Sequence, residues 1–172
     1  MENKTTESTA PEKKPYGKLT PAEKKEILRN LKKKLKTDEV EALGYNRYRT
    51  SERYRVAVGD SFTKLTRDKL YDENGVQIPT NPEYHNIFSF AKGVAVVCIR
   101  SNTQFIDKET GPRFAQDRKD GLIDVDGKEL LPCIYDSISV KLDGFVELTK
   151  DGKRKTTNVG TIVNGDFDWS EE

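Results

Sequence analysis

The sequence contains little of the side-chain chemistry from which most metal and nucleophilic sites are built. It has one histidine, His85, and two cysteines, Cys98 and Cys133. Because there is no second histidine and the cysteines lack metal-ligand spacing, a usual zinc site is not expected. Both cysteines lie in apolar, strand-like runs, which is typical of small buried core residues. A Gly-rich phosphate loop and a Gly-x-Ser-x-Gly nucleophile elbow are also missing. We therefore expect no enzymatic activity, no catalytic residue, no bound metal and no cofactor.

Long apolar runs are absent as well. No window approaches about 18 consecutive apolar residues, so the sequence predicts no membrane-spanning helix and no membrane partner. The first residues carry no apolar stretch of the kind found in secretory signals, so we expect a cytoplasmic location, or one within a viral particle. Apolar and charged residues each make up 34% of the chain. This balance predicts one domain with extensions and a core that uses only part of the chain.

Composition and periodicity divide the chain into four segments. Residues 1–18 are polar and predict a flexible, disordered tail. Residues 19–44 predict a basic, amphipathic helical segment. Residues 45–165 alternate like strands and are broken by Asn-Gly and Asp-Gly turn signals, which predicts a domain of β-hairpins. Residues 166–172 form an acidic C-terminal tail with one tryptophan.

The helix has a clear start signal in the sequence. Thr20 is followed by Pro21 and by Glu23, the arrangement of a capping box with proline in the first turn. The helix is expected to end near residues 36–37, and residues 38–43 are expected to add a short helical turn that stops at glycine. Its apolar positions recur at helical spacing at Ile27, Leu28, Leu31 and Leu35.

An internal repeat is the strongest pattern in the chain. Residues 70–79 and 121–132 each contain an apolar pair, an Asp, a glycine three residues later and a short run that reaches a proline. Each copy continues to a tyrosine, Tyr84 or Tyr135, with an isoleucine three residues on and a glycine nine residues on. Repeats of this kind cannot bury their apolar faces singly and must stack. The residues expected to point inward are Tyr84, Ile87, Val94, Val96, Ile123, Leu131, Tyr135, Ile138 and Val146.

The two copies resemble the WG-repeat family of bacterial β-repeat proteins. The resemblance is carried by residues 121–132, which read Gly-Leu-Ile-Asp-Val-Asp-Gly-Lys-Glu-Leu-Leu-Pro, and by the apolar strand of residues 90–97. It covers residues 53–155 and implies a mainly β fold of stacked antiparallel hairpins, with no catalytic residues to map onto this chain. The signature tryptophan is missing, because Asp120 precedes Gly121 in the better copy.

Two functional hypotheses follow from these patterns. The first is a non-catalytic protein–protein interaction, adaptor or assembly module, such as a structural subunit of a multi-protein particle from a bacterium or a bacterial virus. Its N-terminal helix would dock on a protein partner or in self-assembly, because an apolar stripe needs a surface to cover it, either the body of the chain or a partner groove. The residues assigned to this contact are Ile27, Leu28, Leu31, Lys32, Lys33 and Leu35.

The second hypothesis is nucleic-acid binding by the basic helix and a strand of alternating tyrosine and arginine within residues 20–55. Residues 1–55 carry 15 Lys or Arg against 9 Asp or Glu, whereas residues 56–172 carry 15 against 20. Cations interleaved with aromatic rings can track phosphates and stack on bases. The acidic remainder would repel phosphates, which favours the first hypothesis. The residues assigned to nucleic-acid contacts are Arg47, Tyr48, Arg49, Arg53, Tyr54 and Arg55.

Overall fold

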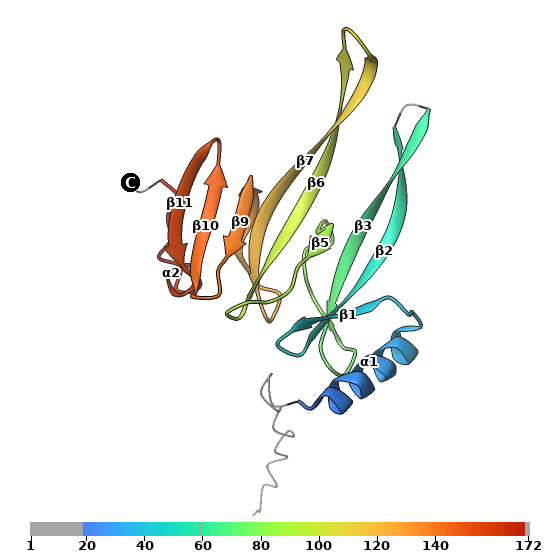
Figure 1. Cartoon of the computed structure of the whole chain (residues 1–172), viewed down its shortest axis with the longest axis vertical. Helices are drawn as coiled ribbons and strands as arrows, with labels where there is room; N and C mark the ends of the chain where they lie inside the picture. The colour runs from blue at the N-terminus through green and yellow to red at the C-terminus, as the bar shows by residue number, and fades with distance from the viewer. Residues whose placement is uncertain (1–18, 59, 171–172) are drawn as a thin grey trace, which may run out of the picture.

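The computed structural model describes residues 19–58 and 60–170 and consists of three antiparallel β-sheets placed one after another, with a helix at each end (Figure 1). The predicted mainly β fold of stacked hairpins, preceded by one helix, is confirmed. The predicted tail at residues 1–18 lies outside the described residues.

The sheets repeat one plan: a short first strand, a hairpin and, in the first two sheets, a short fourth strand. The first sheet contains β1 (Val40–Gly44), β2 (Arg47–Val58), β3 (Ser61–Tyr71) and β4 (Gln77–Ile78). The second contains β5 (Asn86–Ile87), β6 (Val94–Asp107), β7 (Gly111–Asp124) and β8 (Glu129–Tyr135). The third contains β9 (Ser137–Val140), β10 (Phe145–Lys150) and β11 (Lys153–Asn158).

Strand register confirms that the second and third sheets are copies of one unit. Asn86 of β5 pairs with Cys98 of β6, and Ser137 of β9 pairs with Thr149 of β10. Both partners are shifted by the same 51 residues, from 86 to 137 and from 98 to 149. The internal similarity seen in the sequence is therefore a repeated pairing scheme in space.

The turn that opens each repeat is built in the same way in both copies. The Asp72 carboxylate accepts hydrogen bonds from the amides of residues 74 and 76, at 2.8 and 2.9 Å. The Asp124 carboxylate accepts from the amides of residues 126 and 128, at 2.9 Å each. Gly75 and Gly127 follow with φ of +74° and +79°, a left-handed conformation that glycine adopts without strain. The Asp-x-x-Gly spacing is therefore a local turn motif, as its residue types predict.

Buried side chains form one cluster at each junction between neighbouring elements. The first junction joins the N-terminal helix to β1 and β2, the second joins sheets one and two, and the third joins sheets two and three. Equivalent residues occupy the second and third clusters, including Tyr84 and Tyr135. Of the nine residues predicted to point inward, eight are buried and Val96 is half-buried.

Helix α1 (Pro21–Leu35) begins as predicted, with the Thr20 hydroxyl accepting from the amide of Glu23 at 3.2 Å. The predicted helical turn over residues 38–43 is wrong, because this segment is strand β1. Lys36 adopts a left-handed conformation, with φ of 54°, and ends the helix. The chain then pairs with β2, where Val40 and Leu43 are buried. Tertiary pairing has overridden a weak local helix preference.

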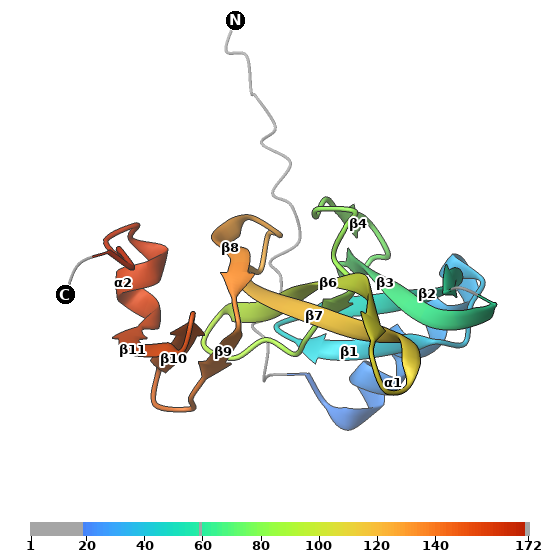
Figure 2. The same ribbon diagram turned by 90° about the horizontal axis from the view of Figure 1, so that it is seen from above.

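The two helices cover opposite ends of the array (Figure 2). The side chain of Leu31 in α1 closes over the Gly75 turn, where a methyl group on the glycine would lie 3.2 Å from it. In the next repeat the equivalent Gly127 is covered by Pro79 from the preceding unit. Helix α1 thus takes the place of a preceding repeat. A second, unpredicted helix, α2 (Val159–Val163), buries Ile162 against the last sheet.

Candidate functional site

Two hairpins extend well beyond the stacked body and form the most prominent surface of the molecule (Figure 1). The first hairpin arm is the outer part of β2 and β3, residues 51–67, where β2 has passed its last pairing with β1 at Thr50. The second hairpin arm is the outer part of β6 and β7, residues 100–118. The third hairpin is short, because β10 and β11 have six residues each. The two arms therefore offer the surface least involved in holding the repeats together.

A buried aspartate at the base of each arm joins one sheet to the next. Asp68 of β3 is 4% exposed, and its carboxylate accepts a hydrogen bond from the amide of Ile87 in the second sheet at 2.8 Å. Asp120 of β7 is 2% exposed and accepts from the amide of Ile138 in the third sheet at 3.1 Å. A charge this deeply buried is stable only when it is paired. Asp120 accepts two further bonds from Arg118, at 2.7 and 3.2 Å.

Asp120 stands directly before Gly121, where the WG-repeat resemblance implies a tryptophan. The departure therefore has a structural role, because the substituted side chain is the acceptor that ties two sheets together. Sequence reasoning singled out the turn aspartates but not Asp68 or Asp120. The available signal was their shared place, four residues before the turn aspartates Asp72 and Asp124.

The residues assigned to partner contact on α1 lie largely against the body of the chain. Leu31 is 2% exposed and packs with Val40 and Tyr48. Ile27, Leu28 and Leu35 are half-buried around the same cluster. Lys32 is half-buried and Lys33 is exposed. The body of the chain therefore covers much of the apolar stripe. This is one of the two alternatives given by the sequence, the other being a groove on a partner.

Of the residues assigned to nucleic-acid contact, the first three have partners within the fold. Arg47 is 9% exposed and donates to the carbonyl of Val125. Tyr48 is buried beneath α1. Arg49 donates to Glu41 at 2.6 Å and to the carbonyl of Ile87 at 2.6 Å, so it also links the first two sheets.

The other three residues of that set lie on the first hairpin arm. Arg53 and Arg55 are exposed, and Arg53 forms an ion pair with Glu39 at 3.2 Å. Tyr54 lies on the opposite face, where its hydroxyl is 2.9 Å from Nε2 of His85. The structure thus places three residues of the predicted set at the base of the arm with partners inside the fold, and further out it exposes Arg53 and Arg55 but leaves Tyr54 half-buried.

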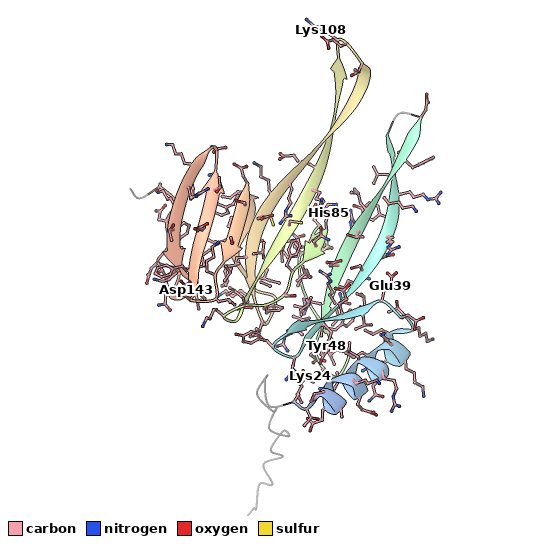
Figure 3. All side chains as sticks on the ribbon, viewed as in Figure 1. Lys24, Glu39, Tyr48, His85, Lys108 and Asp143 are labelled. Atoms are coloured by element: carbon pink, nitrogen blue, oxygen red, sulfur yellow. The ribbon has the colours of Figure 1, made fainter. Side chains whose placement is uncertain are left out.

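His85 lies where the two arms meet the body (Figure 3). Both nitrogens of its ring have hydrogen-bond partners. The amide of Arg100 donates to Nδ1 at 3.0 Å, so in the neutral ring Nε2 carries the proton and donates to Tyr54. Burial lowers the pKa of His85 below its ordinary value, and the positive charges of Arg67 and Arg100 add to this effect. The histidine therefore serves as a neutral bridge between the arms.

The cysteines lie in surroundings that suppress thiolate formation. Burial raises the pKa of Cys98, and burial with the nearby Glu129 carboxylate raises the pKa of Cys133 to about 12. Thiolates are the reactive form of cysteine, so these environments favour a packing role. Among residues 19–58 and 60–170 no cluster of three or more His, Cys, Asp or Glu is placed to hold a metal ion. Within the same residues no helix has the length and apolar content needed to cross a membrane.

Comparison with known proteins supports the repeat architecture. No curated protein and no solved structure matches the chain significantly. A family model described as "WG containing repeat" matches residues 80–102 and 121–153. The first match contains β5 and the first part of β6, and the second runs from the end of β7 through β10. The two matched segments lie within the internal copies that the sequence and the strand register reveal, which is consistent with a WG-repeat family.

Proposed function

We propose that this protein is a non-catalytic interaction or assembly module whose hairpin arms contact a protein partner. A single observation carries the proposal. The stacked repeats and both helices bury their apolar faces within the chain, whereas the two arms extend beyond this body and present open strand edges. Open edges of this kind are templates for pairing with another polypeptide. A place in a multi-subunit or viral particle is consistent with this architecture.

We place the proposed docking surface on the arms and not on the N-terminal helix to which the sequence had assigned it. The apolar stripe of α1 packs on β1 and β2, so removing residues 1–44 would also remove strand β1 and uncover Tyr48. Loss of binding in such a truncation would not separate docking from misfolding. The arms can be shortened with less damage if the residues at their base are kept, because the body clusters lie below them and Tyr54 and Leu65 then stay in place.

A matched pair of shortened proteins tests the proposal. Deleting residues 55–58 and 61–64 shortens the first arm, and deleting 102–107 and 111–116 shortens the second. Each deletion removes an equal and even number of residues from both strands, four in the first arm and six in the second. The strand pairing that remains, and the side of the sheet to which each residue points, are therefore unchanged. Circular dichroism and denaturation should show that the body still folds.

The readout is binding to a partner identified by cross-linking in the native cell and then purified. The full chain should form a complex in size-exclusion chromatography and calorimetry, and at least one shortened protein should lose it. The proposal would be wrong if both shortened proteins bound the purified partner as well as the full chain. It would also be wrong if the full chain showed turnover of a substrate.

A further inference from the structure

The outer part of the first hairpin arm has one face that is cationic and aromatic. In the register of β2 and β3, Arg53 lies opposite Thr66, Arg55 opposite Lys64 and Ala57 opposite Phe62. Directly opposed residues in an antiparallel pair project to the same side of the sheet. All but Thr66, which is half-buried, are exposed, and Phe62 is 69% exposed. We call this set of six residues the arm face.

The arm face contains two like charges directly opposite each other. Arg55 and Lys64 are cross-strand neighbours, an arrangement that destabilises a strand pair unless an anion lies between them. Within the described part of the chain, neither side chain has a carboxylate within ion-pair distance. Arg53 does have one, Glu39, but both side chains of that pair are more than half exposed. A negatively charged ligand at the arm face would therefore reduce the repulsion between the Arg55 and Lys64 side chains.

The edge of β2 beside this face is open. Pairing with β1 ends at Thr50, and over residues 19–58 and 60–170 no other strand pairs with that side of β2. In an antiparallel pair, alternate residues direct their backbone N–H and C=O groups away from the partner strand. Arg53, Tyr54, Arg55 and Lys64 also line a hollow of about 180 Å³. A polypeptide strand can therefore add to β2 from Ser51 outward.

We propose that the β2 edge of the first hairpin arm binds an extended acidic segment of a partner protein, which adds as a strand. Alternate residues of a strand are about 6.6–6.8 Å apart and share one side. Acidic residues at positions i and i+2 of the added strand would lie beside Arg53 and Arg55. An apolar residue at i+4 would lie beside Ala57 and Phe62. The recognised pattern is acidic-x-acidic-x-apolar, or its reverse in the opposite strand direction.

Charge favours this occupant over two others. A second copy of β2 would bring its own Arg53 and Arg55 against this face, and like charges across a strand pair disfavour such pairing. A nucleic acid would meet only three cations here, Arg53, Arg55 and Lys64, against roughly six to ten phosphate contacts in a typical complex. A nucleic acid also could not use the open backbone edge.

The test uses the full chain and a labelled peptide, Thr-Glu-Val-Glu-Val-Phe-Thr, with glutamine replacing both glutamates in the matched control peptide. Fluorescence anisotropy should show that the acidic peptide binds at least about tenfold more tightly than the control. The double variant Arg55→Glu with Lys64→Glu should lose at least about tenfold in affinity for the acidic peptide. The same variant should gain affinity for a peptide with lysine in place of both glutamates. The charge-matched variant Lys92→Glu with Lys108→Glu, altered at exposed lysines outside the arm face, should bind like the unmodified chain.

Amide chemical shifts locate the contact, and changes should concentrate at residues 51–57. The inference is overturned if the acidic peptide does not bind, if it binds the charge-reversed arm equally well, or if proline in the centre of the peptide has no effect. It is also overturned if random single-stranded DNA displaces the acidic peptide when the concentration of DNA phosphates equals the concentration of peptide carboxylates. The inference rests on the proposed function, but the two can fail separately. If the purified partner still binds the charge-reversed variant fully, the module survives and the acidic strand does not.

Discussion

Replacing Asp120 by alanine should break the joint between the second and third sheets. The carboxylate is almost fully buried and accepts the amide of Ile138 across the joint. It also accepts two bonds from Arg118 within its own strand. The variant leaves a buried amide without an acceptor and separates a guanidinium from its counter-charge.

The magnitude follows from the two contacts. A buried amide left without a partner costs about 1–3 kcal/mol, and a hydrogen bond to a charged group contributes about 1.5–3 kcal/mol. The Arg118 side chain is 40% exposed and can turn to water, so its share is smaller. We expect a loss of about 3 kcal/mol in the free energy of unfolding. Asparagine at the same position keeps an acceptor for the amide and should lose about half as much.

Urea denaturation followed by circular dichroism measures this loss. The control is Asp117→Ala, which removes an exposed carboxylate on the same strand and should change stability by less than about 0.5 kcal/mol. Because stacked repeats are held by nearest-neighbour contacts, the alanine variant should also unfold less cooperatively, with the third sheet lost first. A loss for Asp120→Ala no larger than for the control would refute the idea that this carboxylate joins the sheets.

Three further predictions concern other parts of the fold. Asp124→Ala removes the acceptor for two turn amides and should cost about 1–2 kcal/mol in urea denaturation, whereas loss below about 0.3 kcal/mol would contradict the turn assignment. The folded pKa of His85 lies below its unfolded value, so its stabilising contribution is present above pH of about 6.5 and falls as the pH drops from there toward the folded pKa. Denaturation midpoints at pH 7.5 and 5 should show this loss, and His85→Gln should weaken it; an unchanged pH dependence in the variant would assign the effect elsewhere. Leu31→Ala opens a cavity between α1 and the first sheet and should cost about 2–4 kcal/mol, and a cost below about 1 kcal/mol would mean that α1 does not cap the array.

The candidate site could be predicted only in part from the sequence. Alternating tyrosine and arginine over residues 47–55 predicted a strand, and β2 is that strand. The pattern could not distinguish Arg47, which is buried and paired, from Arg55, which is exposed. That distinction depends on where β1 stops pairing with β2. The alternation of residues along β2 does not reveal how far a neighbouring strand extends beside it.

The sequence by itself determined the features that need only neighbouring residues. The helix start at Thr20 and the Asp-x-x-Gly turns at Asp72 and Asp124 rest on contacts within a few residues, so residue type and spacing suffice to predict them. The repeat can be read directly from the similarity of its two copies. Tertiary structure decided the rest. Residues 40–44 became a strand because β2 offered pairing and a buried face. Asp68 and Asp120 became joints because they meet the amides of Ile87 and Ile138, which lie 19 and 18 residues further along the chain. These contacts form only when whole repeat units stack on one another, so the spacing of residues within one segment does not predict them.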